Sequence, residues 1–295
     1  MIFGSNLMLQ KSGSQVLDCP ACGHATLHRY LYSMNASKIF QCTACELGRA
    51  QTQNFDPAAY YTKQYFSGQS NDGYVDYLGS ENVLGSEFAR TIEFIRPYCS
   101  QGRLLELGCA YGFFLQQAKR VFDVSGIELA NEAADYCRRS GLNVLTGTAD
   151  EVNMRQIGNV DAIVLLDVIE HLPDPRQTLD LCKSYLRPGG IVLLTTGDFG
   201  SLLSRLTGSH WRLMTPPQHL WFFTRESMRR LAETLTMQLV SLDHPWKIVP
   251  LSLIIFQARR MLGFHNEGKT RMSRLGLPVN LFDAMRIVLR KPMQP

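Results

Sequence analysis

Between residues 101 and 200, short apolar runs alternate with longer segments in which apolar residues recur at helical spacing. The short runs are typical of buried strands and the longer segments of amphipathic helices. The pattern predicts strands at 124–129, 143–147, 161–168 and 191–196, and helices at 85–98, 111–122, 131–140 and 175–186. Such alternation implies parallel strands joined by right-handed crossovers. The predicted fold class is therefore α/β, with a Rossmann-like, doubly wound and mostly parallel sheet.

The segment 104–115, LLELGCAYGFFL, leads from the first strand of this region into its first helix. Its turn contains the small residues Gly108, Ala110 and Gly112, which allow a sharp bend and the close approach of a ligand to the backbone. Ligands of doubly wound sheets bind beyond the carboxyl ends of the strands. Acidic residues gather at those ends here: Glu106, Glu128, Asp150 and Asp167. This edge of the sheet is the predicted ligand site.

Two Cys-x-x-Cys pairs precede the α/β region, Cys19 with Cys22 and Cys42 with Cys45, and 19 residues separate them. Two such knuckles supply the four thiolates of a tetrahedral zinc site, and the intervening segment can form two short strands. Because so small a segment cannot be held by burial alone, metal binding should contribute much of its folding free energy. We predict a structural zinc ribbon over residues 1–52, with the nearby histidines, His24 and His28, not ligating.

Residues 53–100 form a predicted linker that is rich in aromatic residues and ends in the helix at 85–98. Its tyrosines and phenylalanine alternate with glycines. The segment therefore fits either a lid that closes over a ligand or a strap whose rings pack on the larger domain. That domain is predicted to span 101–295.

The formal net charge of +4 is unevenly distributed, because residues 246–295 carry nine Lys or Arg against two acidic residues. The apolar residues of 250–262 recur at helical spacing, which predicts a basic amphipathic insertion at about 247–277. Three uses fit it: packing on the core, capping an acceptor pocket, or contact with a membrane surface or a lipid-linked phosphate. A phosphate-bearing acceptor is consistent with its arginines.

Composition limits the class of protein. Hydrophobic residues make up 45% of the chain, enough for a buried core. Neither a secretory signal nor an apolar run long enough for a transmembrane segment is recognisable, which predicts a cytoplasmic protein. Pairing of four of the eight cysteines at metal-ligand spacing also favours a reducing compartment.

Over residues 101–245 the motifs and their order resemble class I S-adenosylmethionine-dependent methyltransferases. Glu106-x-Gly108-x-Ala110-x-Gly112 is similar to the first motif of that family, with Ala110 in place of its central glycine. The segments 167–175 and 186–190 resemble later motifs. A nicotinamide-binding fold fits less well, because no glycine occupies the third position of Gly-x-Gly-x-x-Gly.

The resemblance implies a seven-stranded sheet and S-adenosylmethionine as the cofactor. Glu128 would accept hydrogen bonds from both ribose hydroxyls, and Asp150 would receive the adenine amino group. The implied cofactor-binding residues are Glu106, Gly108, Ala110, Gly112, Glu128, Leu129, Asp150 and Asp167.

The whole layout, including the segment 216–224 (PPQHLWFFT), resembles a subgroup of these methyltransferases that acts on sugars, polysaccharides or other small metabolites. Methyl transfer from a sulfonium depends mainly on alignment and on removal of an acceptor proton. His219, in a loop that precedes a helix beginning near Thr224, is the first candidate base, with a packing role as its alternative. His171 is the second candidate.

A metal site is the alternative for this edge of the sheet. Asp167, Glu170 and His171 resemble an element of ubiquinone-biosynthetic O-methyltransferases that is associated with a divalent metal. Two carboxylates and an imidazole could hold Mg²⁺ or Zn²⁺ beside an acceptor hydroxyl. The other interpretation is that the Glu-His pair only orients the loop.

The sequence thus predicts a zinc-ribbon-bearing methyltransferase that methylates a hydroxyl or carbon of a small molecule, a carbohydrate or its nucleotide- or lipid-linked form. Alternatives are a quinone-type O-methyltransferase, a zinc-ribbon nucleic-acid-binding protein or RNA methyltransferase, and a domain that binds cofactor without turnover. Residues 1–52 carry four basic residues against two acidic ones, which is too few for a basic stripe, so no nucleic-acid partner is expected.

Overall fold

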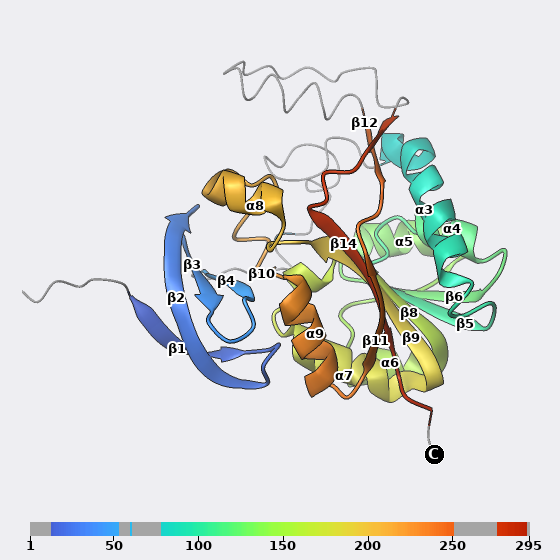
Figure 1. Ribbon diagram of the computed structural model, residues 1–295. Coiled ribbons are helices and arrows are strands. Elements are labelled where there is room, and N and C mark those ends of the chain that lie inside the picture. The colour runs from blue at the N-terminus through green and yellow to red at the C-terminus, as the bar shows by residue number, and fades with distance from the viewer. Residues whose placement is uncertain (1–12, 53–59, 61–77, 251–275, 294–295) are drawn as a thin grey trace, which may run out of the picture.

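The computed structural model describes residues 13–52, 60, 78–250 and 276–293. A seven-stranded sheet forms its centre, in the order β11-β14-β9-β8-β5-β6-β7 (Figure 1). The five strands from β9 to β7 run parallel, whereas β14 is antiparallel to β9 and to β11. The bounds are β5 (Arg103–Leu107), β6 (Asp123–Glu128), β7 (Asn143–Thr146), β8 (Val160–Leu166), β9 (Leu186–Gly197), β11 (Gln238–Asp243) and β14 (Ala284–Arg290). The predicted mostly parallel seven-stranded sheet is confirmed.

Helices cover both faces of this sheet (Figure 1). On one face, α3 (Glu81–Ile95), α4 (Phe113–Ala118) and α5 (Asn131–Arg139) share a core with Leu104 and Val164. On the other, α6 (Glu151–Ile157), α7 (Pro175–Tyr185) and α9 (Arg225–Thr234) share a core with Leu105 and Leu165. Successive strand residues point to opposite faces, which is why the inner strands read as continuous apolar runs.

The cysteine-bearing segment forms a second sheet of five strands, in the order β1-β2-β3-β4-β10. Its first four strands, β1 (Ser14–Cys19), β2 (His24–Met34), β3 (Ser37–Cys42) and β4 (Gly48–Gln51), come from the N-terminal region. Strands β2 and β3 are the two expected between the cysteine pairs. The fifth strand, β10 (Trp221–Phe222), comes from the larger region and pairs antiparallel with β4. The two sheets are therefore joined through one short strand.

Several elements differ from those predicted. Helix α4 begins at Phe113, two residues later than predicted, because Gly112 adopts a left-handed conformation (φ 73°) at its N-cap. The helical segments α6, α8 (Leu202–Thr207), η1 (Leu78–Ser80), η2 (Ile169–His171) and η3 (Gly208–His210), and the strand β11, have no counterpart among the elements predicted from the sequence. They are short, and their apolar residues do not stand out at a regular spacing.

The two ends of the predicted basic insertion are strands. Strand β12 (Lys247–Pro250) pairs antiparallel with β13 (Gly276–Val279). The predicted amphipathic stripe at 251–262 and, except for Tyr60, the aromatic run at 60–77 lie outside the described residues. No helix in the described part of the chain is long and apolar enough to cross a membrane.

Candidate cofactor and acceptor site

The turn between β5 and α4 needs small residues at two of its positions. Gly108 and Gly112 both have positive φ angles, 69° and 73°. A Cβ on Gly108 would lie 2.7 Å from Cγ2 of Val168, and one on Gly112 would lie 2.5 Å from Cδ1 of Leu142. The glycines thus serve both the backbone conformation and the close packing of the turn.

Ala110, between them, also adopts a left-handed conformation (φ 46°). Its backbone N–H donates to Oε2 of Glu128 at 2.8 Å, and the N–H of Ala130 donates to Oε1 at 2.8 Å. The Glu128 carboxylate therefore ties the turn to the carboxyl end of β6. Burial raises the pKa of Glu128, while the backbone hydrogen bonds that it accepts oppose that rise.

Glu106 is buried on β5, with 4% of its surface exposed, and its Oε2 has no hydrogen-bond partner among the described residues. Burial raises the pKa of Glu106 well above its usual range, and the nearby Cys137 and Glu128 raise it further. A buried carboxyl oxygen without a partner is costly. A ligand that brings a cationic or hydrogen-bond-donating group to the turn would remove that cost, and the ammonium group of S-adenosylmethionine fits this requirement.

The other predicted cofactor-binding residues also lie at this edge of the sheet. Leu129 is half-buried directly after β6. Asp150 is exposed and caps α6, with Oδ1 accepting from the N–H of Asn153 at 2.9 Å. Asp167 follows β8 in a left-handed conformation (φ 54°), and its Oδ1 accepts from Oγ1 of Thr195 at 2.9 Å. The cap bond leaves Asp150 to contact a ligand only through its remaining oxygen lone pairs.

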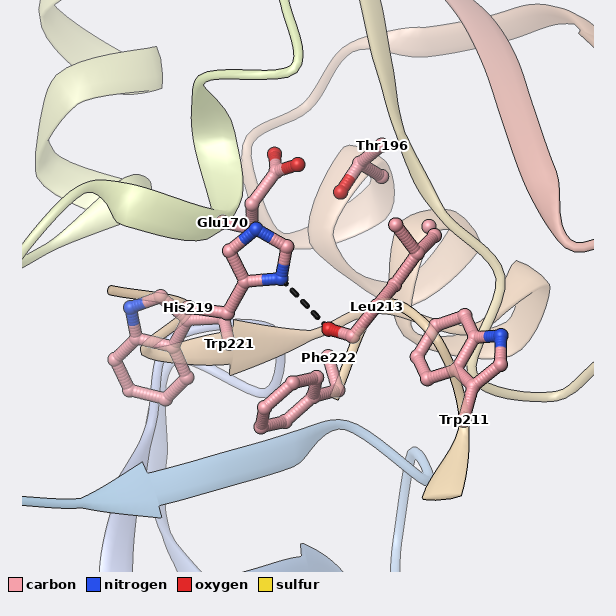
Figure 2. Close-up of a pocket in the computed structure, with 8 residues that line it drawn as sticks. Glu170, Thr196, Trp211, Leu213, His219, Trp221 and Phe222 are labelled. Atoms are coloured by element: carbon pink, nitrogen blue, oxygen red, sulfur yellow. Dashed lines mark hydrogen bonds between the residues drawn. The ribbon is translucent and has the colours of Figure 1, made fainter. Parts of the chain in front are cut away.

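The two candidate bases are neighbours. The rings of His171 and His219 lie 4.7 Å apart, edge to face. Nδ1 of His171 lies 2.8 Å from the carbonyl oxygen of Gln218. Nδ1 of His219 lies 2.8 Å from the carbonyl oxygen of Leu213 (Figure 2). Because a carbonyl oxygen only accepts, each Nδ1 carries the proton and donates it. The lone pair of each neutral ring is therefore on Nε2.

Both imidazoles are held in the neutral state. Burial lowers the pKa of His171. Burial, together with the neighbouring His171, lowers the pKa of His219 to about 3. At neutral pH each ring can accept a proton or bind a metal ion, but neither acts as a cation.

Glu170, His171 and His219 could hold a metal ion, since each offers one ligand atom and these atoms all lie within 4.8 Å of one another. A carboxylate with two imidazoles suits several divalent transition metals, including zinc. The carbonyl bonds to Nδ1 orient the rings as second-shell bonds do in metal sites. The group contains His219, whereas the set predicted from the sequence had Asp167.

A small pocket borders the ring of His219 (Figure 2). Its wall includes Glu170 and His219 together with residues from β9, β10 and the 211–213 loop. Those that the sequence did not single out for the site are Thr196, Gly197, Trp211 and Leu213. No local motif marks them. Trp221 and Phe222 were visible only as part of the aromatic run after His219.

The four predicted zinc ligands form a separate cluster. Cys19, Cys22, Cys42 and Cys45 are all buried, with at most 4% exposed, and their sulfur atoms lie within 4.8 Å of one another. Four converging sulfurs fit a tetrahedral structural zinc ion. The group of converging ligand atoms contains the four cysteines and does not include His24 or His28.

A mostly parallel sheet of this strand order, with a glycine turn after β5 and a buried carboxylate ending β6, defines a Rossmann-like protein built to bind a nucleoside-bearing cofactor. Residues 81–242, more than half of the chain, match the family described as "Methyltransferase domain", and the chain belongs to this family. The resemblance to class I S-adenosylmethionine-dependent methyltransferases is thereby confirmed.

The individual relatives are only distantly similar to this chain. The chain is 30% identical over 158 residues to the ubiquinone biosynthesis O-methyltransferase of Methylococcus capsulatus, covering 50% of this chain and 64% of that protein. The enzyme of the same name from Saccharophagus degradans is 30% identical over 108 residues, covering 34% and 46%. The chain thus spans less than two thirds of the length of either relative.

A solved S-adenosylmethionine-dependent methyltransferase from Archaeoglobus fulgidus superimposes with a TM-score of 0.50 at 18% identity, covering 72% of this chain and 94% of that one. This likeness shows the shared fold.

Proposed function

We propose that this protein transfers a methyl group from S-adenosylmethionine to a hydroxyl or carbon of a small-molecule acceptor. The observation that carries the proposal is the cradle around the β5–α4 turn. There Glu128 ties Ala110 to Ala130, and the buried Glu106 has an oxygen without a partner. The His171–His219 pair lies beyond the neighbouring strand β8, at the same edge of the sheet.

Each predicted cofactor residue has a proposed role. Glu106 receives the ammonium group of the cofactor and Glu128, next to Leu129, receives the ribose hydroxyls. Gly108, Ala110 and Gly112 let the methionine portion lie against the turn. Asp150 receives the adenine amino group through its uncommitted lone pairs, and Asp167 borders the reacting end.

When bound, S-adenosylmethionine supplies an electrophilic methyl group on a sulfonium. The chain's own task is to align the acceptor and take its proton. We assign the proton to Nε2 of His219, whose Nδ1 bond to the carbonyl oxygen of Leu213 fixes the tautomer. The ring is neutral with its lone pair on Nε2, and the nearby Glu170 carboxylate would raise the proton affinity of the ring by stabilising the imidazolium that forms. His171 is the second candidate for this role.

Two acceptor classes compete. A carbohydrate, free or linked to a nucleotide or lipid, is proposed from the layout of the chain. A phenolic, quinone-type acceptor is favoured by the printed name of the O-methyltransferase relatives. Both bring a hydroxyl to the same base.

The remaining proposals concern the ribbon and the surroundings. We propose one structural zinc ion in the four-cysteine cluster, a cytoplasmic location and no nucleic-acid partner. The described ribbon residues include three basic and two acidic side chains, which is too few basic groups for a nucleic-acid footprint. Peripheral membrane contact through the basic insertion remains a proposal from the sequence.

The test is a screen for incorporation of labelled methyl groups, in which the protein and methyl-labelled S-adenosylmethionine meet two acceptor panels. One panel contains sugars, nucleotide sugars and polyprenyl-linked saccharides, and the other contains catechols and polyprenylated phenols. Label should enter a member of one panel, and the change His219→Asn should reduce the turnover at least about a hundredfold. The exposed His210, three residues before Leu213, supplies the control change His210→Asn, which should leave turnover unaltered.

Two results would count against this function. Full turnover in His219→Asn would remove His219 as the base and leave His171. Absence of S-adenosylmethionine binding by the wild-type protein would remove the function altogether.

A further inference from the structure

The ribbon sheet and the candidate acceptor loop, residues 211–223, share backbone hydrogen bonds. Strand β10 lies beside β4, with Trp221 opposite Arg49 and Phe222 opposite Gly48. One residue earlier, the N–H of Ala50 donates to the carbonyl oxygen of Leu220 at 2.8 Å. The pairing therefore begins at the residue directly after His219 and continues through two residues of the pocket wall.

The side chains at this junction are closely packed. The Arg49 guanidinium lies 5.4 Å from the centre of the Trp221 ring, a cation–π contact. A Cβ on Gly48 would lie 2.8 Å from Cβ of Phe222, so the backbones approach more closely there than a larger residue would allow. On the other side of β10, the indole N–H of Trp221 donates to the carbonyl oxygen of Leu172 at 2.8 Å. Strand β10 is thus clamped between the ribbon and the loop that follows β8.

The two cysteine knuckles contact the two ends of α9, the helix that follows the acceptor loop. Oγ1 of Thr224, the N-cap residue, donates to the carbonyl oxygen of Cys45 at 3.4 Å. Oγ1 of Thr234, the last residue of α9, donates to the carbonyl oxygen of Ala21 at 3.1 Å. Since Cys45 is a predicted ligand and Ala21 lies between two others, the knuckle geometry sets the position of both acceptors.

A third contact comes from the tip of the β2–β3 hairpin. Nδ2 of Asn35 donates to the carbonyl oxygen of Pro216 at 2.9 Å, across 181 residues of sequence. Pro216 lies three residues before His219. Ribbon contacts therefore bracket the candidate base, at Pro216 before it and at Leu220 after it, and Figure 1 shows the ribbon strands lying alongside β10 and α9.

From these contacts we infer that the ribbon contributes to the acceptor site. The metal-bound knuckles hold residues 211–223 in place, so the ribbon controls the positioning of the acceptor but not the binding of the cofactor. The inference rests on the proposed function for the identity of that loop as the acceptor side. Asn35 is its positioning residue on the hairpin. Among the described residues, the ribbon forms no hydrogen bond with β5 or β6, and its cysteines meet Leu105, Leu107 and Ile127 of those strands only as members of one extended apolar cluster.

Removal of the metal tests this coupling between the ribbon and residues 211–223. The readout is amide hydrogen exchange, which requires no methyl acceptor. The full chain is compared as purified, after treatment with a zinc chelator, and after zinc is restored. Exchange at Phe222, which pairs with Gly48, and at Ala50, whose N–H donates to the carbonyl oxygen of Leu220, should rise at least about tenfold on chelation and return with zinc, because the pairing between β4 and β10 is lost. Exchange in β5 and β6, and calorimetric affinity for S-adenosylhomocysteine, should change less than about threefold.

A variant separates the coupling from general stability. Asn35→Asp replaces the donor to Pro216 by an acceptor while keeping a residue that tolerates the left-handed conformation observed there (φ 47°). It should raise exchange of the 211–223 amides about two- to tenfold, the equivalent of one hydrogen bond, with zinc content unchanged. Gln41→Glu is the matched control, because Nε2 of Gln41 donates to the carbonyl oxygen of Glu46 within the ribbon.

Unchanged exchange of residues 211–223 after metal loss would overturn the inference. So would an equal rise in β5 and β6, because the metal would then stabilise the whole chain rather than the acceptor loop. A wild-type protein that shows the coupling but binds no S-adenosylhomocysteine would contradict the proposed function alone.

Discussion

At the scale of single residues, the turn after β5 combines three left-handed positions, and one of them is an alanine. A left-handed alanine is strained by about 1 to 2 kcal/mol, and Ala110 keeps that conformation while its N–H donates to Glu128 and its carbonyl oxygen accepts from Sγ of Cys137 at 3.2 Å. The central position of the motif therefore tolerates alanine because both of its backbone groups are bonded.

The low pKa of His219 links protonation to stability. A histidine with a pKa of about 3 in the folded state takes up protons more readily in the unfolded chain, where its pKa is near 6.5. Folding is therefore favoured above that unfolded value, and the contribution is lost as the pH falls below it. His171, whose pKa is also lowered, acts in the same direction.

We expect the free energy of unfolding to fall between about pH 7.5 and about pH 5.5, with His219 accounting for about 1 kcal/mol of the loss. Urea denaturation at a series of pH values measures it. In His219→Asn this part of the pH dependence should disappear, because the amide does not titrate and can still donate to Leu213. The change His210→Asn should keep the wild-type slope; equal slopes in wild type and His219→Asn would show that His219 is protonated as readily as an exposed histidine.

At the scale of elements, Gly112 and Gly141 offer a matched pair of left-handed glycines. Their φ angles are 73° and 76°, but a Cβ on Gly112 would contact Leu142 and Cys137, whereas one on Gly141 would meet nothing within 4 Å. Gly141→Ala should lower the free energy of unfolding by about 1 kcal/mol, from backbone strain alone. Gly112→Ala should lower it by about 3 kcal/mol, because the start of α4 must also move.

Urea denaturation compares these two variants directly, and calorimetry with S-adenosylhomocysteine shows whether the moved turn also loses affinity. Similar losses of stability in both would mean that the turn relaxes around a methyl group, and that close packing is not the reason for glycine there.

The same elements show how far the sequence predicted the structure. The parallel strands were predictable because their apolar runs are long and bounded by turns, and the positions of Glu106 and Glu128 at strand ends followed from them. Strand β10 was not predictable, since two residues, Trp221 and Phe222, form a strand only because β4 lies beside them. The approach of His219 to His171 depends on another contact between residues far apart in the sequence, the N–H of Leu220 donating to the carbonyl oxygen of Glu170 at 2.9 Å. Spacing along the chain carries no record of it.

At the scale of the whole molecule, the chain joins a metal-binding sheet to a cofactor-binding sheet through its acceptor side. The ribbon cysteines belong to the same buried core cluster as Trp221 and Phe223 and the helix residues of α7 and α9. The ribbon is therefore packed on the larger region over a continuous apolar surface. Replacing Cys42 by Ser should abolish zinc retention, measured by elemental analysis, and lower the thermal midpoint. The control Cys182→Ser changes a buried cysteine that is not among the four predicted zinc ligands, and it should retain zinc.

The central claim is that the edge formed by β5 and β6 binds S-adenosylmethionine. Isothermal titration of S-adenosylhomocysteine into the wild-type protein, Glu128→Gln and the exposed control Glu93→Gln tests it most directly. We expect the wild type and the control to bind with equal affinity. Glu128→Gln should bind at least about tenfold more weakly, because glutamine has one side-chain oxygen where the carboxylate offers two to the ribose hydroxyls. Equal affinity in all three proteins, or none in the wild type, would contradict it.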